Sequence, residues 1–241
     1  MTEPSTFHAY STEHWLAIAL IFALPFALAA AVRASRWRHA ERVVDCALSV
    51  IFVVVYIGQL VFVRRIAQVG WTEMLPMQMC DWALVVVLVA LWSKNHRWFE
   101  VAYFWGIGGT LQAILTPDLR FGFPDPRFLT FFIAHGGIIV GVIFLMLRHR
   151  LRPYAFSIVR AFAWSEFYFI CALTVDLLTG VNYGYLLHKP QAQTLLSVLS
   201  DSWPIYLLQM HLLALVFFVL LYLPFAVFDL FHRTNREGMP A

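Results

Sequence analysis

One cysteine and one histidine, Cys80 and His135, have the side-chain types that acyl transfer needs. A thiolate can attack an ester carbonyl, and an imidazole can first remove the thiol proton and later protonate the leaving alkoxide. Both residues lie near the start of an apolar run, in MLPMQMCDWAL and in FLTFFIAHGG. We therefore treat Cys80 as a candidate nucleophile and His135 as its candidate base.

Polar side chains recur at the corresponding ends of the neighbouring apolar runs. Ionisable groups in hydrocarbon cost about 2.5–3.5 kcal/mol each on insertion scales, so they face a partner or a cavity. Acid and amide groups such as Gln78, Asp81 and Gln112 can hold an imidazole tautomer or stabilise an oxyanion. Further supporting or substrate-binding side chains are predicted in this layer, namely Thr116, Asp118, Asn182, Tyr183, Tyr185 and His211.

The composition decides which kind of fold positions these residues. Of the 241 residues, 61% are hydrophobic and 13% are charged, and the mean hydropathy is +0.72. Soluble proteins carry about 25% charged residues, so a water-soluble fold could not bury this much apolar surface. We predict an all-α, polytopic transmembrane helical bundle that forms a single membrane domain over residues 1–241. Cys46, Cys80 and Cys171 lie in or beside apolar runs, which excludes a disulfide framework as the organising principle.

Seven apolar runs have about the length of a membrane span, near residues 14–32, 43–63, 74–92, 99–116, 129–147, 157–179 and 204–228. With the N-terminus outside, the inner segments hold eleven basic residues, Arg33, Arg36, Arg38, Arg42, Lys94, Arg97, Arg148, Arg150, Arg152, Arg233 and Arg236. The outer segments then hold five, Arg64, Arg65, Arg120, Arg127 and Lys189, and Arg160 lies within the sixth run. Because cytoplasmic loops are rich in Lys and Arg, we predict a multi-pass protein of the cell membrane that is N-out and C-in.

This orientation places Cys80 and His135 at a similar depth below the non-cytoplasmic face. His135 follows the start of its run by about seven residues, which is roughly 10 Å along a helix. Phospholipid ester carbonyls lie at the boundary between headgroups and hydrocarbon, so a nucleophile there can meet an acyl ester without extracting the lipid. In a helix that starts at residue 74, Cys80 lies too deep for the helix dipole to activate the thiol. We therefore expect activation to rest on His135.

Structural roles compete with each of these assignments. A cysteine in a membrane helix most often packs as a small hydrophobe, which is our interpretation of Cys46 and Cys171. A single histidine between helices is most often a hydrogen-bond partner, and Asp81 is equally suited to binding a neighbouring helix. Glu100 and Glu166 are expected to pair with Arg97 or Arg160. The small-xxx-small pair at residues 137 and 141 is typical of close helix packing.

Several ordered motifs over about residues 70–225 resemble the YwaF-like family of bacterial integral membrane proteins. They are LPMQMCD at 75–81, FEVAYFWGIGGTLQAILTPD at 99–118, FFIAHGG at 131–137, NYGYLLHKP at 182–190, and WPIYLL with LLYLPF near the C-terminus. That family is similar to a eukaryotic transmembrane acyltransferase family that moves polyunsaturated acyl chains onto lyso ether phospholipids through a cysteine and a histidine. The resemblance implies these roles for Cys80 and His135, although many family members have His where this chain has Gln78.

The predicted function is that of a membrane-embedded acyltransferase acting on phospholipid or lysophospholipid acyl esters. Membrane lipids are its expected substrates, and we expect no cofactor, no metal ion and no nucleic-acid partner. One alternative is a small-solute or proton-coupled transporter, whose path would use Asp81, Gln112, His135 and Asp176 and would have to continue to the cytoplasmic face. Another is a metal-dependent membrane hydrolase, whose three or four ligands would come from His135, His211, Asp81 and Cys80.

Overall fold

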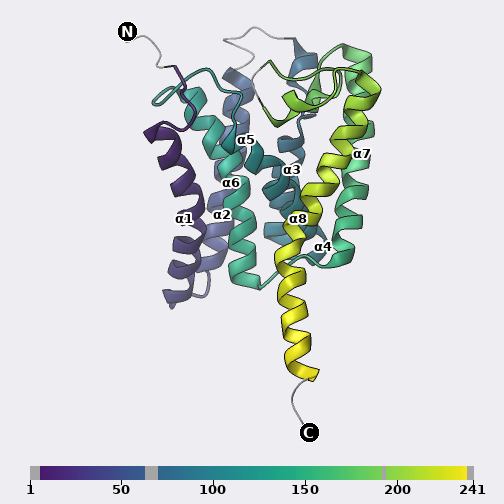
Figure 1. The fold of residues 1–241 in the computed structure, drawn as a ribbon. Helices are drawn as coiled ribbons and strands as arrows, with labels where there is room; N and C mark the ends of the chain where they lie inside the picture. The colour runs from purple at the N-terminus through teal and green to yellow at the C-terminus, as the bar shows by residue number, and fades with distance from the viewer. Residues whose placement is uncertain (1–5, 63–69, 192–193, 238–241) are drawn as a thin grey trace.

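The chain forms a bundle of helices that run roughly side by side (Figure 1). The computed structural model describes residues 6–62, 70–191 and 194–237, the last six of these by their backbone alone. The long elements are α1 (Thr12–Ala34), α2 (Ala40–Phe62), α3 (Met79–Ser93), α6 (Pro126–His149), α7 (Ala155–Thr179) and α8 (Trp203–Glu237). The short elements are η2 (Trp71–Met74), α4 (His96–Tyr103), η3 (Phe104–Thr110), α5 (Leu111–Leu115), η4 (Tyr183–Tyr185) and η5 (Leu195–Val198).

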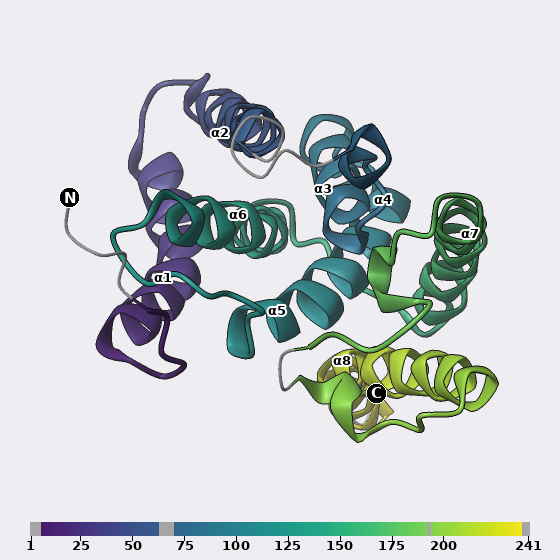
Figure 2. The same cartoon turned by 90° about the horizontal axis from the view of Figure 1, so that it is seen from above.

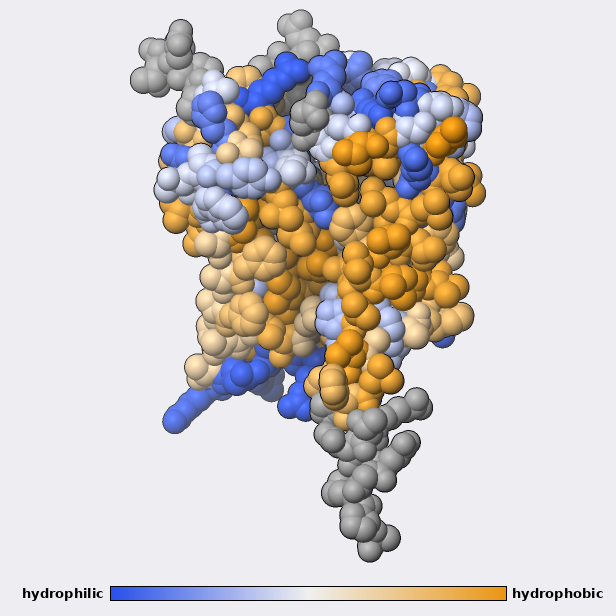
Figure 3. All heavy atoms as spheres, viewed as in Figure 1, coloured by the Kyte–Doolittle hydropathy of each residue, from blue (hydrophilic) through white to orange (hydrophobic). Residues whose placement is uncertain are grey.

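Six helical segments are long and apolar enough to cross a membrane, which confirms the predicted all-α polytopic bundle. They are Thr12–Ala34, Ala40–Phe62, Trp71–Ser93, Pro126–His149, Ala155–Thr179 and Trp203–Phe231. Figure 3 shows an apolar belt between hydrophilic bands at the two ends of the molecule. We call the end at which α1 begins the upper end and the opposite end the lower end, as in Figure 1. Three residues that the spans and charge counts included, Val63, Arg64 and Arg65, lie outside the described residues.

The fourth predicted span, 99–116, corresponds to a helical run that changes its winding. It consists of α4, the π-helix η3 and α5, which follow one another directly, and it begins earlier, at His96. The interruption falls on FWGIGGT, where three glycines loosen the backbone and allow the wider π-turn. This segment lies inside the bundle, and Phe104, Trp105 and Ile114 are fully buried (Figure 2).

Helix α6 is the central packing element, because its glycines admit side chains from three other helices. A Cβ atom added at Gly136 would lie 2.5 Å from Ile21 of α1, and one at Gly141 would lie 2.7 Å from Val87 of α3. At Gly137 the added Cβ would collide with the ring of Phe52 on α2, which is 0% exposed. The close packing predicted from residues 137 and 141 is thus confirmed, and it fixes α1, α2 and α3 relative to α6.

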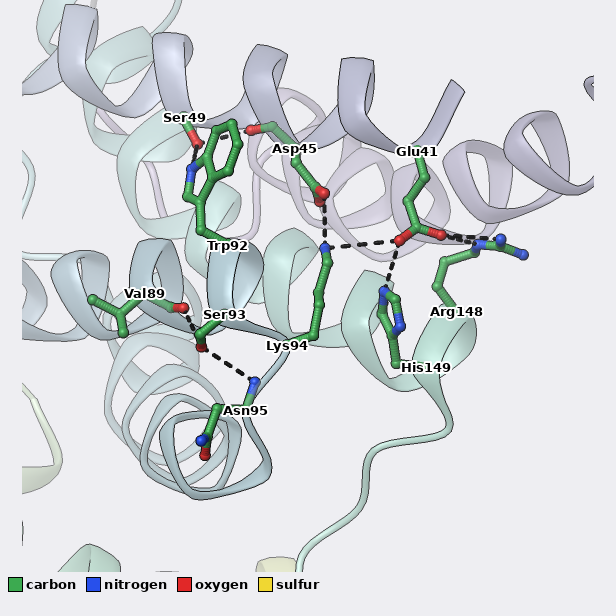
Figure 4. Close-up of polar contacts among 10 residues, drawn as sticks. All are labelled: Glu41, Asp45, Ser49, Val89, Trp92, Ser93, Lys94, Asn95, Arg148 and His149. Atoms are coloured by element: carbon green, nitrogen blue, oxygen red, sulfur yellow. Dashed lines mark hydrogen bonds and ion pairs between the residues drawn. The ribbon is translucent and has the colours of Figure 1, made fainter. Parts of the chain in front are cut away.

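Ion pairs join α2 to α3 and α6 at the lower end (Figure 4). Lys94 Nζ donates to Asp45 Oδ2 at 2.7 Å, and Arg148 donates to Glu41 Oε2 at 3.0 Å. His149 Nε2 lies 2.9 Å from Glu41 Oε1. Asp45 has only 7% of its side chain exposed, so its charge depends on Lys94 for compensation.

A second set of polar contacts inside the bundle confirms one expected pair and corrects another. Glu100 is completely buried and binds both Arg160 and the Ser157 hydroxyl. The predicted partner for Glu166 is wrong, because its carboxylate lies 3.3 Å from His211 Nε2 on α8. Helix packing decides this outcome, since Glu166 faces α8 from the middle of α7.

Replacement of Gly137 tests the packing of α2 against α6. Gly137→Ala should lower the stability of the purified protein by about 1–3 kcal/mol, because the new methyl group displaces the ring of Phe52 from its packed position. Gly58→Ala is the matched control, since a Cβ there meets nothing within 4 Å. Thermal unfolding in detergent measures both, and equal melting temperatures for the two variants would contradict the packing.

Loss of Lys94 tests the lower-end ion pairs. Removing one partner of a buried pair costs about 3–5 kcal/mol, and Lys94→Met should fall near the lower value because Lys94 is 27% exposed. The double variant Asp45→Asn with Lys94→Met should recover most of the loss, because no buried charge is then left unpaired. Both are measured by thermal unfolding, and a double variant as unstable as Lys94→Met would argue against a charge effect.

Candidate functional site

Cys80 and His135 line one cavity at the upper end of the bundle. The cavity has a volume of about 170 Å³ and lies among α2, the segment from η2 to α3, α6 and the loop after α7. Its lining residues are Tyr56, Gln59, Leu60, Glu73, Met74, Leu75, Gln78, Cys80, Asp81, Leu84, Ala134, His135, Ile138 and Tyr183. Gln59, Glu73 and Gln78 are exposed, whereas Cys80 and His135 are half-buried. The cavity therefore has an open rim and places the two candidate residues on its inner wall.

Cys80 is the second residue of α3, which corrects the expectation that it lies too deep for the helix N-terminus to act on it. The helix begins at Met79, after an extended residue Gln78. Pro76 explains why η2 does not continue into α3, because a proline disfavours the helical conformation in the residue before it, and Leu75 is extended with φ −65° and ψ 143°. Cys80 thus lies in a first helical turn, where free backbone N–H groups and the helix dipole stabilise negative charge.

His135 is held in one tautomer by its own helix. Its Nδ1 atom lies 2.9 Å from the carbonyl oxygen of Phe131, and the two rings stack with centroids 4.2 Å apart. Because a carbonyl group can only accept, Nδ1 carries the hydrogen and Nε2 of the neutral ring carries the lone pair. Phe131 therefore sets the tautomer, a role that had been suggested for Gln78, Asp81 or Gln112. The remaining nitrogen has the form that a general base needs.

Gln78 and Asp81 close the first turn of α3 and connect it to the loop after α7. The Gln78 N–H group donates to Asp81 Oδ2 at 3.1 Å, and Gln78 Oε1 accepts a hydrogen bond from the N–H group of Gly184. One oxygen of the Asp81 carboxylate is thus occupied in capping the helix. Both residues line the cavity, and both also fix the position of the turn that carries Cys80.

Tyr183 anchors the extended segment that precedes Cys80. Its hydroxyl donates to the Thr72 carbonyl at 2.6 Å and accepts from the Leu75 N–H group at 3.0 Å. Burial, followed by nearby carboxylates that include Asp81, raises the pKa of Tyr183 above its ordinary value, so the hydroxyl keeps its proton. A second phenol, that of Tyr168, donates to the Met77 carbonyl at 3.0 Å.

The other predicted residues are not among the lining residues of this cavity. Thr116 bonds back to the Gln112 carbonyl at the end of α5, and Asn182 binds backbone groups of Leu187 and His188 within its own loop. Their hydrogen bonds are thus satisfied locally, which a linear sequence pattern does not reveal.

Tyr185, Asp118 and His211 also lie away from the cavity wall. Burial, and then the charge of Asp118, raises the pKa of Tyr185, which indicates that these two side chains are neighbours. His211 Nδ1 bonds to the Leu207 carbonyl, and its other nitrogen faces Glu166.

Sequence reasoning missed the contribution of α2, which supplies Tyr56, Gln59 and Leu60 to the cavity. The sequence does contain a signal for it, because Tyr56 and Gln59 are three residues apart and share one face of the otherwise apolar upper half of α2. The alternative of a metal-dependent hydrolase needs three or four ligands that lie close together. Within the described parts of the chain, no three His, Cys, Asp or Glu side chains are grouped so that they could hold a metal ion.

Comparison with protein-family models matches residues 9–222 to the TMEM164 family. The chain belongs to the TMEM164 family. The matched residues include every lining residue of the cavity, so this membrane-protein family covers the whole candidate site. A search of curated proteins found no match. A search of solved structures found none either.

The hydroxyl of Tyr183 gives a test of how the Cys80 turn is held. Tyr183→Phe should cost about 1–3 kcal/mol, because it leaves the Leu75 N–H group without its partner. Amide hydrogen exchange in residues 71–78 should become faster while exchange in α1 stays the same. Tyr10→Phe, at a side chain that is 54% exposed, is the control. Unchanged exchange in residues 71–78 would show that Tyr183 does not anchor this segment.

Proposed function

We propose that this member of the TMEM164 family is a membrane-embedded acyltransferase that acts on phospholipid or lysophospholipid acyl esters. Cys80 is the nucleophile and His135 is the general base. The observation that carries the proposal is that these two residues, on different helices, line the same cavity, with the His135 tautomer fixed by Phe131.

The reaction takes place in two halves. His135 Nε2 accepts the thiol proton while Cys80 Sγ attacks the ester carbonyl of a phospholipid, and a C–S bond forms. The C–O bond of the ester then breaks, and the imidazolium protonates the departing alkoxide to give a lysophospholipid. In the second half, the hydroxyl of a lysophospholipid gives its proton to His135 and attacks the thioester. The C–S bond breaks, the imidazolium returns a proton to the thiolate, and a new phospholipid leaves.

The start of α3 supports this chemistry at the carbonyl oxygen. The first N–H groups of a helix have no partner within it, and Cys80, the second residue of α3 and a lining residue of the cavity, contributes such a group. These donors are suited to the negative charge that develops on the ester oxygen as the thiolate attacks. Helix geometry thus supplies charge stabilisation next to the nucleophile itself.

The sequence motifs give independent support. LPMQMCD and FFIAHGG resemble the cysteine and histidine segments of the YwaF-like family and of the related eukaryotic acyltransferase family. We also propose that the protein lies N-out and C-in in the cell membrane, with the cavity near the non-cytoplasmic face. The excess of Lys and Arg in segments at the lower end supports this orientation.

A transport function has less support. Polar groups at the lower end are joined in ion pairs, Lys94 with Asp45 and Arg148 with Glu41. Phe52, which is 0% exposed, lies between these pairs and the cavity. A polar path from the cavity along α2 would therefore have to pass this buried ring.

Labelling of the purified protein with a thiol-reactive acyl probe, read by mass spectrometry, tests the proposed pair. Cys80 should be acylated in the wild type, and His135→Ala should slow this by about 10²–10⁴-fold, which is the usual contribution of a general base. Cys46→Ser and Cys171→Ser are matched controls that keep the full rate. Equal slow labelling of all three cysteines, indifferent to His135, would show that Cys80 is a packing residue.

A further inference from the structure

The cavity is much smaller than the lipid on which the proposed reaction acts. Its volume of about 170 Å³ is close to that of an engineered protein cavity of about 150 Å³ that binds one benzene molecule. An acyl chain in one leaflet extends through about half of a hydrocarbon core that is roughly 30 Å thick. The cavity can therefore hold the ester group and the first carbons of the chain, and the rest of the chain must lie elsewhere.

The route downward through the bundle is closed. Phe52 lies one helical turn below Tyr56 on the same face of α2, and its side chain is 0% exposed. Its ring fills the space beside Gly137 of α6 so completely that an added methyl group would collide with it. Phe52 thus fills the space between α2 and α6 below the cavity, and the chain cannot pass between the lower halves of these two helices.

The route sideways, between the upper halves of α2 and α3, is less constrained. In the described parts of the chain, the polar contacts between these two helices lie in their lower halves, where Lys94 binds Asp45 and Trp92 binds Ser49. In the upper half, Leu60 of α2 and Leu84 of α3 are apolar members of the cavity wall. Leu60 is half-exposed, and its neighbour Val61 is 50% exposed on the apolar outer face of α2.

We propose that the acyl chain of a membrane phospholipid leaves the cavity sideways into the bilayer, between the upper halves of α2 and α3. Leu60 and Leu84 form the apolar edges of this portal, and the chain remains in hydrocarbon while its ester reaches Cys80. The inference rests on the proposed acyl transfer and adds the path of the substrate. Helix α2 then has two roles. Its lower half is fixed by ion pairs and by the packing of Phe52, and its upper half borders the path of the lipid.

A bulky side chain at position 60 tests the portal with two donors that differ in chain length. Acyl loading of Cys80 is followed by mass spectrometry, with long-chain phosphatidylcholine vesicles or with water-soluble dibutyryl phosphatidylcholine as donor. Leu60→Trp should lower the ratio of long-chain to short-chain loading by at least about tenfold relative to the wild type, whatever its effect on the short-chain reaction alone. Val61→Trp, at the same depth on the outer face, should leave both unchanged.

The outcomes separate this inference from the proposed function. The portal is overturned if Leu60→Trp is loaded from both donors at the wild-type rate, or if it loses loading equally with both. Leu60→Ala is a second variant that widens the same edge, and it should keep long-chain loading at or above the wild-type level; a large fall would also overturn the portal. If Cys80 of the wild-type protein gains no acyl group from either donor, the result contradicts the proposed function itself.

Discussion

The packing of α6 against its neighbours is the constraint on which the candidate site depends. Gly136, Gly137 and Gly141 leave room for one side chain each from α1, α2 and α3, so these helices approach α6 closely. Because α3 carries Cys80 and α6 carries His135, this packing also determines where the two residues lie on the wall of the cavity. The geometry of the site thus depends on glycines, which have no side chain and therefore add nothing to the pattern of polar residues in the sequence.

Two local features prepare these residues for chemistry. Pro76 delays the start of α3, so Cys80 lies in a first turn beside free N–H groups. The carbonyl of Phe131 binds Nδ1 of His135, so Nε2 is left to accept a proton. Each feature comes from the backbone near the residue concerned, and neither requires a third side chain to act as an orienting acid.

The membrane bundle could be predicted from the sequence because hydropathy is strong over six of the seven predicted spans. Apolar length alone did not reveal that the fourth span contains a π-helix at its glycines, or that an extended Leu75 separates η2 from α3. Five of the eleven predicted site residues do line one cavity, namely Gln78, Cys80, Asp81, His135 and Tyr183. The other six could not be excluded, since the direction of a side chain depends on helix rotation. His211, for example, turns toward Glu166.

The central claim is that Cys80 accepts an acyl group from a membrane lipid with the help of His135. The most direct measurement is the intact mass of the protein after incubation in vesicles made of a single phospholipid. The account predicts a mass increase of one acyl chain of that lipid, located on Cys80, removed by hydroxylamine as a thioester, and lost in His135→Ala. An unmodified wild-type protein under conditions in which the fold is intact, or a modification that persists without His135, would contradict it.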